Sequence, residues 1–255
     1  MEASQVNQLL VLFTLVLARL GGLIAVAPVL GSRHVPVRFR VLLAVFLALI
    51  VTPLQSMNHI PAPSLLDYTV LLGGEALVGL TLGLGVAVLF SGIRVAGQLI
   101  SQMGGLQLAD VFSPGSDESV PVVSELLYLV ALAVFLTSGG HRKLVEAVLD
   151  TFQSLPLAGG ISAGSLAGAV TSVLSESFAL GVRAAAPIVA SLLLATLVAG
   201  LLSRILPQFN TAVAGFGLNS AILLGSLGVT LGAAAWVFNS QVEPTLELLL
   251  EALRG

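Results

Sequence analysis

Cysteine is absent from this chain of 255 residues, so disulfide frameworks and thiolate metal sites are excluded. Histidine is also scarce, and His34, His59 and His141 lie in separate connecting segments without a spacing typical of metal ligands. The HExxH, GxSxG and GxxxxGK[ST] motifs are missing, as is any pair of carboxylates at a catalytic spacing. We therefore predict a protein that is not an enzyme, with no catalytic residues, no metal and no cofactor.

Charged residues are also scarce in this sequence. Charged residues make up 9% of the chain and hydrophobic residues 56%, with a mean hydropathy of +1.05, whereas soluble domains are about a quarter charged. A helix crosses a bilayer with roughly 20 predominantly apolar residues, and several such runs follow one another here. The composition predicts an all-α, polytopic helical membrane protein. The net charge of −3 gives no sign of the excess of basic residues that is typical of nucleic-acid-binding proteins.

About six apolar helices are predicted to span the membrane. Their ranges are Leu9–Leu30, Val41 to about Pro53, Leu65 to Phe90 with an extension toward Ile100, Val122–Thr137, a stretch within Ser172–Leu202 and a stretch within Thr211–Val237. The third is longer than a bilayer requires and is expected to be tilted, kinked or partly outside lipid. The start of the chain has no basic segment, and Arg19 interrupts the first apolar run, so we expect a retained span, not a signal peptide.

Two further segments have the pattern of amphipathic helices. Leu144, Val148 and Phe152 follow one another at steps of four, which predicts a short helix after the fourth span. The tail 243–255 carries leucines along one face and Pro244 where a helix would begin. We expect this C-terminal helix to dock on a partner or to lie at an interface.

Charged residues inside the apolar segments are few, and an unpaired charge in hydrocarbon is costly. They are Arg19, Glu75, Arg94, Glu125, Glu176 and Arg183. One interpretation is an ion or substrate path, and the other is buried ion pairs that pack against other subunits. Carboxylates do not recur at helical spacing, so proton pumping has little support.

Glycines recur at steps of four, which allows close helix packing within the chain or with partners. The series are Gly79 and Gly83, Gly160 with Gly164 and Gly168, and Gly228 and Gly232. Pro187 is predicted to bend the fifth span. A secondary transporter would use bent helices of this kind, but the two halves of the chain do not match as a repeat. A passive membrane scaffold would need only the glycines.

A long loop at 104–121 separates the third and fourth spans, within "QLISQMGGLQLADVFSPGSDESVPVVSELL". Loops longer than about 12–15 residues without periodicity are usually functional or disordered. Non-helical backbone at membrane depth is tolerated only in protein or beside a water-filled cavity. Gly104, Gly105 and Gly115 permit turns, and the apolar side chains between them could pack together to exclude water. The alternative is an ordinary acidic surface loop.

Five sequence blocks occur in an order typical of one family. They are "LARLGGLIAVAPVLGSRHVPVRFRVLLAVFLALIVTP", "GEALVGLTLG", "GQLISQMGGLQLADVFSPGSDESVPVVSELL", "FLTSGGHRKLVEAVLDTFQSLPL" and "AGLLSRILPQFNTAVAGFGL". Together they extend over nearly the whole chain and resemble the FliR family, the flagellar member of the type III export gate proteins. The injectisome relatives of the SctT and SpaR type share this architecture.

The resemblance implies one integral membrane export-gate domain over 1–255, with a FliP-like N-terminal part and a FliQ-like C-terminal part. It implies a core gate subunit that forms, with FliP-like and FliQ-like subunits, the pore for unfolded secreted flagellar subunits. FlhB-like and FlhA-like export proteins are further expected partners. The expected location is the bacterial inner membrane, in the flagellar basal body. The alternatives are an injectisome gate subunit and, less favoured, a secondary transporter.

The resemblance also assigns site residues. It places a pore plug at Leu106, Gln107, Leu108, Ala109, Asp110, Val111, Phe112, Ser113, Pro114 and Gly115, with Gly104 and Gly105 as its hinge. Polar residues expected in assembly or in buried contacts are Arg19, Glu75, Arg94, Glu125, Arg183, Arg204, Gln208 and Asn210. The family commonly has Asp before the proline at the loop tip, where this chain has Ser113, so a role for that carboxylate is open.

Overall fold

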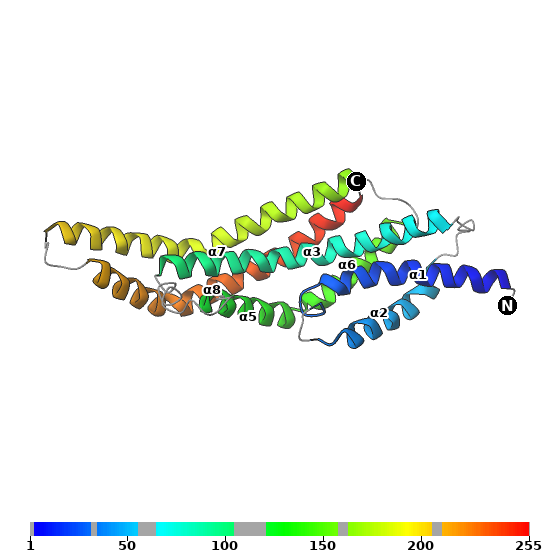
Figure 1. Cartoon of the computed structure of the whole chain (residues 1–255), viewed down its shortest axis with the longest axis horizontal. Coiled ribbons are helices and arrows are strands. Elements are labelled where there is room, and N and C mark those ends of the chain that lie inside the picture. The colour runs from blue at the N-terminus through cyan, green and yellow to red at the C-terminus, as the bar shows by residue number, and fades with distance from the viewer. Residues whose placement is uncertain are drawn as a thin grey trace. The chain divides into compact units, whose positions relative to one another are not determined.

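The structure is a computed structural model that describes residues 3–31, 35–55, 65–104, 121–157, 163–205 and 211–254. This part of the chain is helical and contains no strand (Figure 1). Its elements are α1 (Ala3–Val26), α2 (Val37–Val51), the short 3-10 helix η1 (Thr52–Leu54), α3 (Leu65–Met103), α5 (Val122–Thr137), α6 (Gly140–Ser154), α7 (Ala163–Ile205) and α8 (Thr211–Arg254). The all-α prediction is confirmed.

Five of these helices are long and apolar enough to cross a membrane, and α5 with α6 would add a sixth as one broken span. The prediction of about six apolar helices is therefore confirmed, with changes at their ends. The helix α1 ends at Val26 instead of Leu30 because Pro28 and a turn follow it, and Val29 adopts a left-handed φ of 73°. The fourth predicted span is only 16 residues long and stops before Gly139, whose φ of 75° starts α6.

The chain divides into two compact units. Unit 1 contains residues 1–88, 139–174 and 242–255, and unit 2 contains residues 89–138 and 175–241. In unit 1, α1 and α2 form a helical hairpin, and the buried side chains include Leu15, Leu20, Leu23, Leu82 and Leu144. In unit 2, the ring of Phe90 makes edge-on contacts with Tyr128, Phe135 and Phe238, at centroid separations of 5.5, 5.5 and 4.8 Å. Such edge-to-face arrangements are favourable for aromatic rings.

The amphipathic helix predicted after the fourth span is confirmed as α6, with Leu144, Val148 and Phe152 buried. The predicted start of a separate tail helix at Pro244 is wrong, because α8 continues through this proline to Arg254. Pro244 has no N–H and so removes one helical hydrogen bond, but the helix continues on both sides of it.

The leucine face of the tail is covered by the chain itself. Leu246, Leu249 and Leu253 are 5%, 0% and 2% exposed, whereas Glu243 and Glu247 are exposed. This segment belongs to unit 1, where a side chain at the position of Gly85 would collide with Leu249. The expectation that these leucines dock on a partner is replaced by packing within unit 1.

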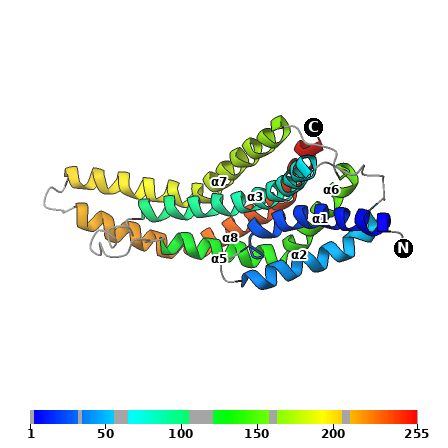
Figure 2. The ribbon, with the colours of Figure 1, turned by 45° about the vertical axis from the view of Figure 1, so that its right-hand side comes forward.

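The helices α7 and α8 are the longest, at 43 and 44 residues. The helix α7 contains Pro187 and changes direction near its middle, which can be followed in both orientations (Figures 1 and 2). Proline removes one helical hydrogen bond and crowds the preceding turn, so a bend at this point has a local cause. The expected bend in the fifth span is present.

Candidate functional site

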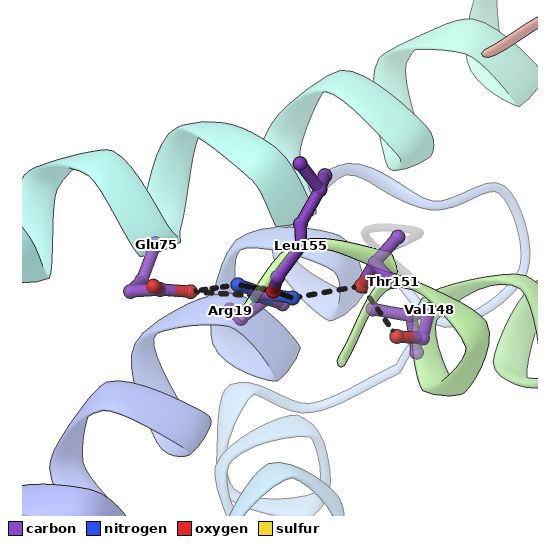
Figure 3. Close-up of polar contacts among 5 residues, drawn as sticks. All are labelled: Arg19, Glu75, Val148, Thr151 and Leu155. Carbon is purple, nitrogen blue, oxygen red and sulfur yellow. Dashed lines mark hydrogen bonds and ion pairs between the residues drawn. The ribbon is translucent and has the colours of Figure 1, made fainter. Parts of the chain in front are cut away.

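Arg19 has the largest fully buried side chain in the described part of the chain. It lies on α1, and its Nε donates to Oε2 of Glu75 on α3 at 2.6 Å. Nη2 lies 2.6 Å from the same oxygen, and the two side chains are 1% and 6% exposed (Figure 3). A buried guanidinium of this kind requires a compensating anion, because unpaired burial of a charge is very unfavourable.

The remaining guanidinium donors point at α6. Nη1 donates to Oγ1 of Thr151 at 3.0 Å, and both terminal nitrogens lie within 3.3 Å of the carbonyl of Leu155. Thr151 in turn donates its hydroxyl hydrogen to the carbonyl of Val148 at 2.6 Å (Figure 3). Leu155 directly follows α6, and the carbonyl end of a helix dipole attracts a cation. The ring of Phe152 lies 4.5 Å from the guanidinium carbon.

Direct contact between the backbones of α1 and α3 places this ion pair. A Cβ at Gly79 would collide with the carbonyl oxygen of Arg19, and one at Gly83 would lie 2.9 Å from the carbonyl oxygen of Leu23. Gly22 on α1 faces the backbone of Ala76 in the same way. Small residues allow helices in membranes to approach this closely. The predicted role of Gly79 and Gly83 in close packing thus has a specific location, at the crossing of α1 and α3.

The Arg19 cluster joins three helices and is suited to fixing them. Every guanidinium nitrogen has an acceptor, and the cation is matched by one carboxylate. A proton path needs a series of titratable groups, and the partners that Arg19 has here beyond Glu75 are a hydroxyl, a carbonyl and an aromatic ring. This arrangement favours the interpretation of a buried ion pair over that of an ion path.

A second group of contacts joins the two helices that flank the long loop. In unit 2, Nη2 of Arg94 on α3 lies 3.6 Å from Oε2 of Glu125 on α5, and both side chains are about half exposed. The guanidinium of Arg94 also stacks 4.0 Å above the ring of Tyr128. Ser124 donates its hydroxyl hydrogen to the carbonyl of Arg94 at 2.9 Å, and a Cβ at Gly97 would collide with Ser124. We call Arg94, Glu125, Ser124 and Tyr128 the loop stem.

The end of α3, where the loop begins, is covered by α8. Gly104 is buried, its N–H donates to the carbonyl of Ile100 at 2.8 Å, and a side chain there would collide with Leu223. Asn219 and Ser220 donate to the carbonyls of Met103 and Gly104 at 3.3 and 3.4 Å. Gly104 does not have a left-handed φ, and its observed feature is close contact with the tip of the Leu223 side chain, whereas the hinge prediction was based on backbone freedom.

The other predicted residues are distributed differently. The plug segment Leu106–Gly115, the second hinge glycine Gly105, and Gln208 and Asn210 all lie outside the described residues. Arg183 and Arg204 are exposed on α7, apart from both clusters. The structure thus brings Arg19 together with Glu75, and Arg94 together with Glu125, but not the two remaining arginines.

Thr151 and Tyr128 are contacts that the sequence reasoning missed. Each had a signal: Thr151 is a polar residue on the apolar face of the amphipathic helix, between Val148 and Phe152. Tyr128 follows Glu125 by three residues, which places both on one face of α5. The carbonyl of Leu155 carried no signal, because its role depends on where α6 ends.

The amino-acid sequence of this chain is similar to those of known proteins. The profile of the family described as "Bacterial export proteins, family 1" matches residues 10–245. The "Flagellar biosynthetic protein FliR" of Escherichia coli (strain K12) is 33% identical over 218 residues, which cover 86% of this chain and 81% of that protein. The protein of the same name from Pectobacterium carotovorum subsp. carotovorum is 34% identical over 84% of this chain and 81% of its own length. That of Bacillus subtilis (strain 168) is 28% identical over 94% of each.

Proposed function

The chain belongs to the bacterial export proteins of family 1, as a FliR protein of flagellar biosynthesis, and we propose that it is a core subunit of the gate for flagellar protein export. The gate forms with FliP-like and FliQ-like membrane subunits, and unfolded flagellar subunits pass through it. Family membership assigns the chain to export, not to an enzyme class. The observation that carries the proposal is the family match over residues 10–245, together with relatives named for flagellar biosynthesis.

The architecture supports a subunit that works inside a membrane assembly. Five helices are long and apolar enough to span a membrane, and large apolar side chains remain exposed on α2 and α7. Among them are Phe39, Phe46, Phe178 and Leu194, which are 67%, 61%, 66% and 66% exposed. Lipid or further subunits must cover such surfaces. We assign the chain to the bacterial inner membrane at the flagellar basal body, with a FliP-like N-terminal part, a FliQ-like C-terminal part, and FlhB-like and FlhA-like proteins as further partners.

We further propose that Leu106–Gly115 is the plug of the pore. Support comes from the contacts at both ends of the loop: Ser220 and Leu223 cover Gly104, and the loop stem joins α3 to α5. A loop with such anchors can open and close while its flanking helices stay in place. Opening to an unfolded chain requires an element of low local stability, and a glycine-flanked segment with a few apolar contacts has that property. The loop's apolar side chains would exclude water and ions.

Assembly is tested by co-expression with FliP-like and FliQ-like subunits and by mass measurement in a mild detergent. We expect a mixed complex that contains this chain, and we expect the chain alone to be unstable or aggregated. A monodisperse monomer or homodimer that remains after co-expression would contradict the proposal and would favour a transporter. Flagellar, as opposed to injectisome, export is tested by whether loss of the chain abolishes motility while it spares injectisome secretion.

A further inference from the structure

The polar contacts at the end of α3 centre on one side chain of unit 2, Asn219 on α8. Its Nδ2 donates one hydrogen to the carbonyl of Met103, the last residue of α3, at 3.3 Å. The other hydrogen of Nδ2 goes to Oγ1 of Thr196 on α7 at 3.2 Å. Asn219 thus connects three helices through a single amide nitrogen.

The two acceptors fix the orientation of this amide. Thr196 donates its only hydroxyl hydrogen to the carbonyl of Leu192 at 2.8 Å, so it can only accept from Asn219. The carbonyl of Met103 likewise can only accept. Both contacts therefore require the amide nitrogen of Asn219 on this side, and its Oδ1 is buried without a donor among the described residues. An ionised aspartate has the same shape but no N–H, and it could form neither contact.

The carbonyls at this end of α3 are ones that the helix cannot satisfy by itself. The last carbonyls of a helix lack intrahelical donors and form the negative end of the helix dipole. Ser220 donates to the carbonyl of Gly104 at 3.4 Å, and Gly104 lies against the side chain of Leu223. About one turn of α8, from Asn219 to Leu223, thus caps the end of α3 from outside. A hydrogen-bond donor stabilises this end, whereas a negative charge would be repelled.

We infer that Asn219 is a positioning residue of the gate, which fixes the point where α3 ends and the loop at 104–121 begins. It acts through hydrogen bonds from α8, and Thr196 orients its amide. The inference rests on the proposed function in one respect, because the start of the loop matters to the gate only if the loop closes the pore. Leu192 and Leu223 are 0% and 1% exposed, so apolar packing holds α7 and α8 in unit 2 when the amide is changed.

Thiol labelling of the co-expressed complex tests the position of the end of α3 without reference to the pore. The chain has no cysteine, and Ser101, close to the end of α3, is 1% exposed. Its hydroxyl has no hydrogen-bond partner in the described part of the chain, so Ser101→Cys introduces a protected thiol with little change in contacts. In this background, Asn219→Asp is expected to speed the reaction with a water-soluble maleimide about tenfold. Equal rates with and without Asn219→Asp would overturn the inference.

Two comparisons make this test specific. Asn239 lies on the same helix and is exposed, so Asn239→Asp is the matched control and should leave the labelling rate at the parental value. Asn219→Ala should have a smaller effect than Asn219→Asp, because only the aspartate adds repulsion from the helix end. A side chain that merely filled space would give the opposite order, with alanine more disruptive than the isosteric aspartate. That order, or equal acceleration by Asn239→Asp, would overturn the inference.

Ion flux through the co-expressed complex in lipid vesicles tests the consequence for the gate. Asn219→Asp should leave recovery of the complex close to parental and raise the ion leak per complex about fivefold or more, and Thr196→Val should give a smaller leak. A lower recovery with an ion-tight complex would overturn the inference, since Asn219 would then only stabilise the fold. If the complex that lacks Leu108–Phe112 is also ion-tight, the plug proposal fails instead, and the labelling rates alone decide whether Asn219 positions the end of α3.

Discussion

The guanidinium of Arg19 and the carboxylate of Glu75 form a buried ion pair at 2.6 Å, although 56 residues separate them in the sequence. The pair lies beside the crossing of α1 and α3, where Gly79 allows the two backbones to touch. It also reaches Thr151 and the carbonyl of Leu155 at the end of α6. Three helices of unit 1 thus depend on one charge, which makes this cluster a sensitive point of the fold.

Removal of one member of this pair should destabilise unit 1 strongly. We expect Glu75→Ala to lower the free energy of unfolding by about 3–5 kcal/mol, because it leaves a buried arginine without an anion. The double change Arg19→Met with Glu75→Leu should recover most of this loss, since neither charge is then buried. Denaturant titration of the co-expressed complex in mild detergent measures both effects.

The exposed pair Arg142 and Glu146 is the control for this experiment. Its side chains are 80% and 53% exposed at an N–O distance of 3.0 Å, and such surface pairs contribute at most about 1 kcal/mol. Glu146→Ala should therefore have little effect. An equal loss from Glu75→Ala and Glu146→Ala would contradict a special role of the buried pair.

The glycines of α3 should differ sharply in their tolerance of a methyl group. Gly79→Ala places a Cβ against the carbonyl oxygen of Arg19 and is expected to cost about 1–3 kcal/mol through overpacking. Gly73→Ala on the same helix meets no atom within 4 Å and should be neutral or stabilising by about 0.5–1 kcal/mol. Thermal unfolding of the two variants compares them, and the same melting temperature for both would argue against the close crossing.

The tail should act through the stability of the chain itself. Leu249 is fully buried, so Leu249→Asp is expected to destabilise the fold of this chain by more than about 3 kcal/mol. Glu247 is exposed, and Glu247→Gln should change little. Protease resistance of the chain in membranes of cells that co-express its partners, compared with recovery of the mixed complex, distinguishes the two roles of the tail. Wild-type resistance of Leu249→Asp, combined with a loss of complex formation, would return the tail to a partner interface.

The loop stem should influence the plug without being part of it. Arg94→Ala removes a half-exposed ion pair and a stacking contact, which together contribute on the order of 1 kcal/mol. We expect the complex to assemble and to show a partial leak of small ions, smaller than that caused by deletion of plug residues. An Arg94→Ala complex that assembles and is as ion-tight as the parent would show that the loop stem does not influence closure of the pore.

The sequence predicted the helices well because apolar length and helical periodicity are local properties. The range of α5 and the buried face of α6 followed from such patterns. The same patterns could not identify which charges meet, because the pairing of Arg19 with Glu75 depends on the tertiary crossing of α1 and α3. The predictions for the tail were wrong for a related reason. Proline is common at helix starts, and the sequence does not show that α8 continues through Pro244 or that the leucines after it pack within unit 1.

The contrast between Gly79 and Gly228 illustrates the same limit for helix packing. Both belong to glycine series at steps of four, yet only Gly79 contacts another helix, and a Cβ at Gly228 would meet no atom within 4 Å. Spacing identifies a surface that can approach another helix closely. Whether that helix is in the same chain is decided by the fold, which the sequence pattern does not contain.

Ion flux through the assembled complex in lipid vesicles tests whether the loop closes the pore. Vesicles with the parent complex should hold an ion gradient, whereas vesicles with a complex lacking Leu108–Phe112 should lose it rapidly, because the apolar contacts that exclude ions are gone. Phe112→Ala should give a partial leak, and Asp110→Asn a smaller one. A deletion complex that assembles, remains as ion-tight as the parent and no longer supports export in cells would contradict the plug and would make the loop a contact for cargo or partners.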